Sequence, residues 1–401
     1  MTINNEHNKL NVPNLRFKEF QGEWEKTKFG DIATGFDYGM NAAAKNYDGV
    51  NKYIRITDID EASSTYTDKD IVSPDGVLTD NYLVNNRDIL LARTGASTGK
   101  SYLYKKSDGK LYYAGFLIRA NVTTHDPYFV FSQLHTHRYW RWVSIMSARS
   151  GQPGINSQEY SSFPIYTTSI EEERKIAKLL SLLDERIATQ SKIIEDLKKL
   201  KCAIIEKHYR QAKLHKYKIC DLGVPFSVGS LSKEDLSEEG HECILYGELF
   251  TTYDCVINEV KSHTNKIVNT TLSQKGDLLF PSSTTVDAVS LISPSVIDIP
   301  NVILGGDMFG IHIDKKFNAY YLSYYINLIA RKKLAIYAKG STIIHLHYKD
   351  IAKAQLLLPD LCEQDKIAKC MMAEDAKIKL EEQLLTKLEK QKQYLLRQMF
   401  I

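Results

Sequence analysis

The 401-residue sequence contains no run of about 18 apolar residues, the length that a membrane-spanning helix requires. Its first ten residues, MTINNEHNKL, are polar and include no apolar core of a secretion signal. Six cysteines are present without a C-x-x-C pair, which argues against a zinc site and against a disulfide framework. These absences predict a cytoplasmic protein with no membrane partner and no bound metal.

The net charge is only +3, which is too small to indicate nucleic acid by itself. Any basic surface must therefore come from how the 52 Lys and Arg residues are distributed in space. Apolar residues make up 43% of the chain and charged residues 25%, as in ordinary soluble globular proteins. The length is enough for two to four domains, each with a sizeable core.

One segment approaches a nucleotide-binding loop without completing it. A Walker A loop requires G-x-x-x-x-G-K-[ST] between a strand and a helix. Residues 99–101 are Gly-Lys-Ser, but the first glycine of the motif would fall at Thr94. The residues that follow are β-like and interrupted by glycine, so no helix N-terminus is predicted to hold phosphate. A P-loop NTPase is an alternative that the sequence does not favour.

Two other short patterns resemble catalytic motifs incompletely. Asp126-Pro127-Tyr128-Phe129 is similar to the N-P-P-[YF] motif of adenine methyltransferases, but it lacks the Asn and the second Pro. Pro359-Asp360 with Glu363 lacks the Lys of a P-D…E-x-K nuclease site, because position 365 is Asp. Helix capping explains both patterns better. No catalytic residue is therefore predicted. A self-contained DNA methyltransferase is kept as an alternative.

Two histidine pairs, His135 with His137 and His345 with His347, have i, i+2 spacing. Neither pair has a carboxylate or cysteine nearby at the spacing of a metal site, so packing or surface roles are the better interpretation.

The chain contains an internal repeat of two long helical segments, residues 169–213 and 360–401. The tetrapeptide KIAK at 175–178 recurs at 366–369, an offset of 191. Each segment begins with a capping residue and a glutamate three residues later, Ser169 with Glu172 and Asp360 with Glu363.

Both segments show the 4-3 spacing of a coiled-coil seam. Polar residues interrupt the two seams at matching positions. The predicted seam residues are Ile176, Leu180, Leu183, Ile187, Gln190, Ile194, Leu197, Lys201 and Ile204 in the first helix, and Ile367, Met371, Ile378, Glu381, Leu385, Leu388, Lys392 and Leu395 in the second.

The polar seam positions favour an antiparallel pairing of the two helices. A parallel pairing would place Lys201 opposite Lys392, and like charges in a seam are costly. An antiparallel pairing centred between Glu195 and Asp196 would instead place Lys201 opposite Glu381, and Gln190 opposite Lys392.

Each helix follows a globular segment, and the two segments share one order of predicted elements. The first has β-type segments and then a helix that begins at Asp126 with Pro127 at its first position. The second repeats this order at an offset of about 189, with diverged residues. The predicted strands are 52–59, 88–93 and 112–120 in the first segment and 277–280 and 303–313 in the second, whose helix is 318–338.

This order of parts resembles the specificity subunit of type I restriction-modification enzymes. The opening Pro13-Asn14-Leu15-Arg16-Phe17 with Gly22-Glu23-Trp24 is similar to the usual start of that family. Gly340-Ser341-Thr342-Ile343, Leu358-Pro359 and Glu363-Gln364 are similar to its pattern before a spacer helix. The first copy departs from the pattern, because Glu173 stands where the family often has Gln.

The resemblance implies a non-catalytic chain that binds double-stranded DNA through two target-recognition domains, each reading one half of a split, asymmetric sequence. It also implies two methyltransferase (M) subunits docked on the helices, and restriction/translocase (R) subunits in the full complex. S-adenosylmethionine and ATP with Mg²⁺ would be held by those partners, and this chain would bind no cofactor. A coiled-coil assembly protein without DNA binding is a third interpretation.

The predicted fold is of the α+β class, with two similar α/β target-recognition domains joined by two long antiparallel coiled-coil helices in an internal pseudo-two-fold repeat. The predicted boundaries are 1–168 for the first domain, with 1–13 as a flexible lead-in, 169–213 for the central helix, 214–359 for the second domain and 360–401 for the C-terminal helix.

Polar loops at equivalent places in the two domains are the predicted DNA contacts. Arg and Lys can pair with guanine edges or phosphates, Ser and Thr with either, and Gln and Asn with adenine. Ordinary solvated loops and turns are the alternative for each residue. The candidates are Arg93, Ser97, Thr98, Lys100, Gln152, Asn156 and Ser157 in the first domain, and Ser282, Ser283, Thr284, Thr285, Ser341, Thr342 and His345 in the second.

Overall fold

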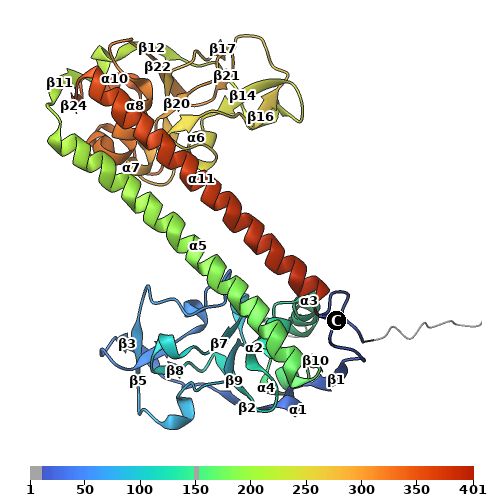
Figure 1. Ribbon diagram of the computed structural model, residues 1–401. Coiled ribbons are helices and arrows are strands. Elements are labelled where there is room, and N and C mark those ends of the chain that lie inside the picture. Colours follow the sequence, from blue (N-terminus) through green and yellow to red (C-terminus); the bar gives the residue numbers. More distant parts are fainter. Residues whose placement is uncertain (1–10, 149–152) are drawn as a thin grey trace, which may run out of the picture. The chain divides into compact units, whose positions relative to one another are not determined.

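The structure is a computed structural model that describes residues 11–148 and 153–401. The chain divides into unit 1, residues 1–191 with 383–401, and unit 2, residues 192–382. Two long helices, α5 (Ile170–Gln211) and α11 (Leu361–Gln398), each contribute one part to both units (green and red in Figure 1). Among the helices at residues 11–148 and 153–401, none combines the length and the hydropathy of a membrane-spanning segment.

Unit 1 is built on a four-stranded antiparallel sheet with the strand order β2-β9-β6-β7. Two-stranded pairs β1-β10, β3-β5 and β4-β8 accompany it. Besides the first part of α5 and the last part of α11, its main elements are β1 (Glu25–Lys28), α1 (Phe29–Ile32), β2 (Ala33–Tyr38), β3 (Ala43–Asn46), β4 (Lys52–Ile54), β5 (Val72–Asp75), β6 (Asp88–Ala92), β7 (Ser101–Leu103), β8 (Leu111–Tyr113), β9 (Leu117–Val122), α2 (Pro127–Gln133), α3 (His137–Ser147), α4 (Ser157–Ser161) and β10 (Pro164–Thr167).

Unit 2 contains two five-stranded sheets with the orders β12-β22-β18-β20-β15 and β13-β16-β14-β21-β17, and the pairs β11-β24 and β19-β23. Its main elements are β11 (His215–Lys218), β12 (Gly223–Ser227), β13 (Leu236–Ser237), β14 (His241–Leu245), α6 (Glu248–Thr251), β15 (Val256–Ile257), β16 (Ser262–Thr264), β17 (Thr271–Leu272), β18 (Asp277–Pro281), β19 (Ser283–Thr284), α7 (Ala288–Leu291), β20 (Ser295–Ile297), β21 (Ile303–Gly305), β22 (Met308–Ile313), α8 (Ala319–Tyr325), α9 (Arg331–Leu334), β23 (Ile344–His345), α10 (Tyr348–Ile351) and β24 (Gln355–Leu358).

One strand in each unit is buried on both faces and separates two hydrophobic cores. In β6, Ile89 and Leu91 face the core that includes α2, while Leu90 and Ala92 face the other core. The counterpart in unit 2 is β18, whose residues Leu278–Phe280 divide in the same way between the core around α8 and a second core. A strand covered on both faces needs a continuous apolar run, which explains why these segments were recognisable in the sequence.

The ends of the long helices belong to the cores of the two units. The first turns of α5, with Ile176 and Leu180, pack into the α2 core of unit 1. The end of α11, with Leu396, and Phe400 just after it pack into the same core. The last turns of α5 and the first turns of α11 pack into the α8 core of unit 2. The two ends of each helix are therefore stabilised by burial of their apolar side chains in these cores.

The predicted helix starts are confirmed. The Ser169 hydroxyl accepts the Glu172 amide at 3.4 Å, and the Asp360 carboxylate accepts the Glu363 amide at 2.9 Å. Asp126 caps α2 through the amides of residues 128 and 129, with Pro127 at the first helical position.

Several predicted elements are shorter than expected because turns interrupt them. The helix predicted from Asp126 is two helices, α2 and α3, and the Thr136 side chain caps the second. Strand 52–59 ends at Ile54, strand 112–120 is divided between β8 and β9, and strand 303–313 between β21 and β22. Helix 318–338 contains a π-helical segment, Ile326–Ala330, between α8 and α9. The predicted domain boundaries remain predictions, and residues 1–10 of the lead-in lie outside the described residues.

Candidate nucleic-acid interface

Two loops that are about 60 residues apart in the sequence meet in unit 1. The Gly95 amide donates to the Pro153 carbonyl at 3.1 Å, and the Ile155 amide donates to the Arg93 carbonyl at 2.9 Å. Thr94 and Gly154 form an antiparallel bridge between these contacts. The structure thus joins the two groups of residues that were predicted separately as DNA contacts in this domain.

Arg93 is the cationic candidate at this junction with an exposed aromatic partner. Its guanidinium lies over the Tyr38 ring, 4.6 Å from the centroid, and Nη1 donates to the Gly115 carbonyl at 3.4 Å. Tyr38 is 42% exposed and Phe116, beside Gly115, is 59% exposed. This cation–π contact positions the guanidinium, whose planar fork of donors has the geometry that pairs with a guanine edge.

Tyr38 and Phe116 were not among the predicted site residues. Each adjoins a glycine, Gly39 and Gly115, in a tight stretch of backbone: an added Cβ at Gly39 would lie 2.2 Å from the Ala114 carbonyl oxygen. An aromatic residue next to such a glycine was the available signal, but it is common in cores as well as at surfaces.

The other unit 1 candidates also hold the local fold. The Thr98 hydroxyl donates to the Gly95 carbonyl at 2.8 Å, and that of Ser157 to the Phe36 carbonyl at 2.6 Å. The Asn156 side chain caps α4 by accepting the Glu159 amide. Lys100 forms an ion pair with Glu61 at 3.1 Å, and Ser97 is partly buried. Gln152 lies outside the described residues.

Unit 2 joins its two candidate loops in the same way. Strand β19 pairs with β23, placing Ser283 opposite His345, and the Leu346 amide donates to the Ser282 carbonyl at 2.8 Å. Ser282 and Ser283 are buried, whereas Thr284 is half-buried. Thr285, Ser341, Thr342 and His345 are exposed, so their side chains are available to a ligand.

The same backbone hydrogen bond, between the ends of two paired strands, occurs at equivalent positions in the two units. The Arg93 amide donates to the Phe116 carbonyl at 3.0 Å, and the Ser282 amide donates to the Asp307 carbonyl at 2.7 Å. The positions that carry a cation and an aromatic ring in unit 1 therefore carry a hydroxyl and a carboxylate in unit 2. Asp307 was also missed from the sequence, because it lies in the turn between β21 and β22 where a single strand was predicted.

The predicted seam residues of both helices are buried or half-buried in the structure. Lys201 forms an ion pair with Asp375 in unit 2, and Lys392 forms one with Asp184 at 2.7 Å in unit 1. Residues late in α5 thus meet residues early in α11 and the reverse, as in an antiparallel pair. The partners differ from those predicted: Asp375 replaces Glu381, and Asp184 replaces Gln190. The prediction matched seam positions alone, whereas these aspartates lie immediately beside the seam.

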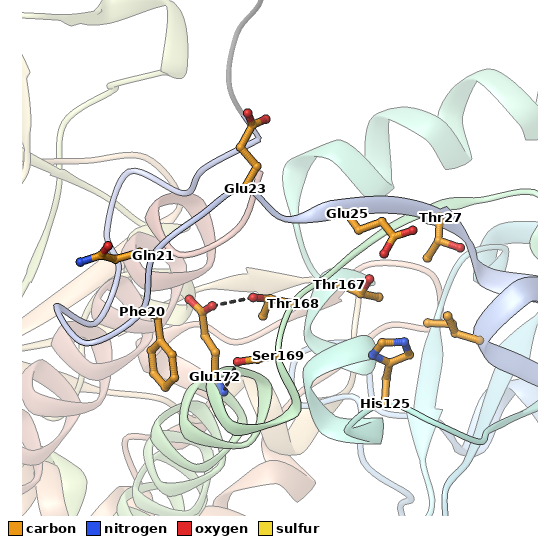
Figure 2. A pocket seen from close by; sticks show the side chains of 11 residues that line it. Phe20, Gln21, Glu23, Glu25, Thr27, His125, Thr167, Thr168, Ser169 and Glu172 are labelled. Carbon is orange, nitrogen blue, oxygen red and sulfur yellow. Dashed lines mark hydrogen bonds between the residues drawn. The ribbon is translucent and has the colours of Figure 1, made fainter.

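A cavity of about 460 Å³ lies in unit 1 between β1, β10 and the start of α5 (Figure 2). Glu23, Glu25 and Glu172 line it together with His125 and several hydroxyl residues. Glu172 is already paired with Arg16, with Nε and Oε1 2.7 Å apart. The acidic lining has the wrong sign for a DNA phosphate, so the cavity does not extend the candidate interface.

The segments that resemble nucleotide-binding or metal-binding motifs have structural roles. Lys100 is followed by strand β7 and not by a helix, so the Walker-like segment provides no helix N-terminus. His135 bonds the Phe131 carbonyl through Nδ1 and the Ser64 hydroxyl through Nε2, both at 2.9 Å. In the described part of the chain, no three His, Cys, Asp or Glu side chains gather as a metal-binding group.

Comparisons with known proteins agree with this organisation. The family model described as type I restriction modification DNA specificity domain matches twice, at residues 21–199 and 212–390. The chain is 24% identical over 411 residues to the putative type I restriction enzyme MjaX specificity subunit of Methanocaldococcus jannaschii, covering 95% of this chain and 94% of the relative.

Two solved structures share the fold. The S subunit of a type I restriction-modification system from M. genitalium has a TM-score of 0.63 at 16% identity, covering 97% of this chain and 99% of that one. A chain from a structure on complex assembly and conformational transition of the type I R-M system has a TM-score of 0.56 at 14% identity, covering 94% and 97%. With two matches of the family model that together span most of its length, the chain belongs to the specificity-subunit family of type I restriction-modification systems.

Proposed function

We propose that this specificity subunit reads a split, asymmetric DNA sequence, with one half-site bound by the loop pair of each unit. The observation that carries the proposal is the equivalent backbone junction in the two units, around which the accessible side chains differ: Arg93 and Phe116 in unit 1, Asp307 and Thr285 in unit 2. A shared framework with different base-facing chemistry is what two readers of different sequences require.

The long helices have a length that suits a spacer between the two DNA-binding loop pairs, which we call the readers. A helix of about 40 residues is about 60 Å long, and duplex DNA rises about 3.4 Å per base pair. Readers separated by such a rod can reach sequences on the order of one to two DNA turns apart, with unread base pairs between them.

In this proposal two methyltransferase subunits dock on the helices and restriction/translocase subunits complete the complex. S-adenosylmethionine and ATP with Mg²⁺ are bound by those partners, and this chain is non-catalytic. The local structure supports this division, because Lys100 is paired with Glu61 and Asp126 caps a helix, so neither near-motif is free for chemistry.

The test is long-read mapping of methylated adenines in cells that express the methyltransferase subunits with and without this chain. We expect a bipartite sequence with a fixed gap to be methylated only when the chain is present. Methylation with no dependence on the chain would contradict the proposal. Methyl transfer or ATP hydrolysis by the purified chain alone would contradict its non-catalytic part.

A further inference from the structure

Each unit contains a hydrogen-bonded triad of a tyrosine, an aspartate and a lysine. In unit 1 the Tyr128 hydroxyl, from α2, donates to Asp184 on α5, and Asp184 also pairs with Lys392 on α11. In unit 2 the Tyr324 hydroxyl, from α8, donates to Asp375 on α11 at 2.5 Å, and Asp375 pairs with Lys201 on α5.

The two triads exchange the roles of the helices. In unit 1 the aspartate is on α5 and the lysine on α11, and in unit 2 the aspartate is on α11 and the lysine on α5. The offset between the aspartates is 375 − 184 = 191, and between the lysines 392 − 201 = 191. The helix members of the triads therefore follow the internal repeat without a shift.

The tyrosines do not follow the repeat in the same way. Their offset is 324 − 128 = 196, and Tyr128 is the second residue of α2, whereas Tyr324 is the sixth residue of α8. The phenol is thus supplied from a different turn of the globular helix in each unit, yet it reaches the equivalent aspartate. This recurrence on diverged globules indicates that the contact has a role beyond local packing.

The triads are only partly accessible to solvent. The side chains of Lys201 and Lys392 are 14% and 18% exposed, and those of Asp184 and Asp375 are 29% and 31% exposed. Burial raises the pKa of the Tyr128 and Tyr324 hydroxyls, so both remain protonated donors. Partly buried charges without partners are costly, so sliding α5 along α11 would be opposed by the aspartate–lysine pair of each triad. Moving a globular part along its long helix would break the tyrosine–aspartate bond instead.

We propose that the two Tyr-Asp-Lys triads are positioning residues that set the register of α5 against α11 and attach each reader to it, and thereby determine the number of unread base pairs between the half-sites. Polar residues in otherwise apolar helix seams specify register in the same way. This inference rests on the proposed function, in which the helices are the spacer.

The length scales agree with this role. One helical turn is about 5.4 Å and one base pair about 3.4 Å, so a slip of a single turn would displace a reader by more than one base pair. A register that is defined to less than a turn is therefore needed for a gap of one fixed length.

The experiment uses the Tyr128→Phe/Tyr324→Phe chain, assembled with its methyltransferase subunits, and maps methylated adenines in cells. We expect both half-site sequences to be unchanged. Methylation of sites whose gap is one base pair shorter or longer should rise about tenfold relative to sites with the original gap, since a hydrogen bond to a charged acceptor is worth about one tenfold step in an equilibrium. The Asp184→Asn/Asp375→Asn chain should relax the gap further.

The matched control is Tyr102→Phe/Tyr320→Phe. Tyr102 donates to Asp108 at 2.6 Å and Tyr320 donates to Asp298, so these tyrosine-aspartate bonds have the same chemistry but stay within the globular parts. The control should keep the original gap.

A gap distribution that is as narrow in the triad variant as in the control would overturn the inference, while a wild-type map without any bipartite site would overturn the proposed function instead. The single variants Tyr128→Phe and Tyr324→Phe keep one triad intact. If the double variant does not fold, a single variant with the wild-type gap distribution would also overturn the inference.

Discussion

At the scale of single residues, the candidate interface is composed mostly of side chains that also stabilise the loops that present them. Thr98, Asn156 and Ser157 each satisfy a backbone group nearby. Arg93 differs, because its charge is held over the Tyr38 ring and is not neutralised by an acid in any contact that the structure describes. Base discrimination in unit 1 is therefore expected to depend on Arg93 most strongly.

Replacing Arg93 by Ala should weaken binding of the assembled complex to its own site by about 1–3 kcal/mol and make one base of one half-site degenerate. A competition shift assay with single-base variants of the site measures both effects. Lys100→Ala is the control: Lys100 is paired with Glu61 and should change affinity little and evenly across sequences. An equal loss on all sequences for Arg93→Ala would show that it contacts phosphate only.

His135 makes the stability of unit 1 dependent on pH. Burial, with the nearby Lys392 charge, lowers the pKa of His135 to about 4. The unfolded imidazole takes up its proton near the ordinary pKa of about 6.5, so this stability is present above about pH 6.5 and is lost as the pH falls toward 4. Because the side chain is partly exposed, we expect a loss of about 1–2 kcal/mol between pH 7.5 and pH 5.

Urea unfolding at the two pH values measures this loss, and the His135→Asn variant should show a smaller difference between them. An equal difference in the variant would assign the pH dependence to other groups.

At the scale of elements, the ends of the long helices are fixed by capping residues and by packing into the cores of the two units. Their capping residues were recognisable because a cap depends on three or four neighbouring residues. The break between α2 and α3 and the division of the predicted strands were not recognisable, because apolar residues continue across both interruptions. The C-terminal end of α11 belongs to the unit 1 core, where the Phe400 ring lies 6.0 Å from that of Trp24 and 5.4 Å from that of Phe129.

Replacing Phe400 by Ala should destabilise unit 1 by about 3 kcal/mol, because it removes a buried ring and leaves a cavity. The three tryptophans of the chain, Trp24, Trp140 and Trp142, all lie in unit 1, so their fluorescence during urea unfolding reports on this unit. Tyr394→Ala is the control in the last turns of α11, just before Phe400, since Tyr394 is 59% exposed and should cost little. Equal midpoints for the two variants would mean that the end of α11 does not stabilise the core.

At the scale of the whole molecule, an internal repeat produces two readers and one spacer from a single chain. The globular segments have diverged in sequence, yet each has a central strand buried on both faces and a pair of loops joined at the same backbone contact. The helices have kept their offset of 191 residues. The two units thus share a framework while their loop side chains differ.

Inserting seven residues, about two helical turns, at matching positions of both long helices should lengthen the gap between the half-sites by about three base pairs, because about 10 Å of helix corresponds to about three base-pair steps. Both half-sites should remain the same. Adenine methylation mapping measures the gap, and an unchanged gap would contradict the spacer role of the helices.

The sequence by itself determined the repeat, the ends of the long helices and their antiparallel pairing, because these depend on periodicity, capping and the sign of a few charges within one segment. Only the tertiary structure decided that the loops of each unit meet, that Asp307 occupies the position equivalent to Phe116, and that Lys201 and Lys392 pair with aspartates beside the seam. Those choices depend on side chains from distant segments: the tyrosines of α2 and α8 hold the aspartates in place, and no pattern within the helices encodes that contact.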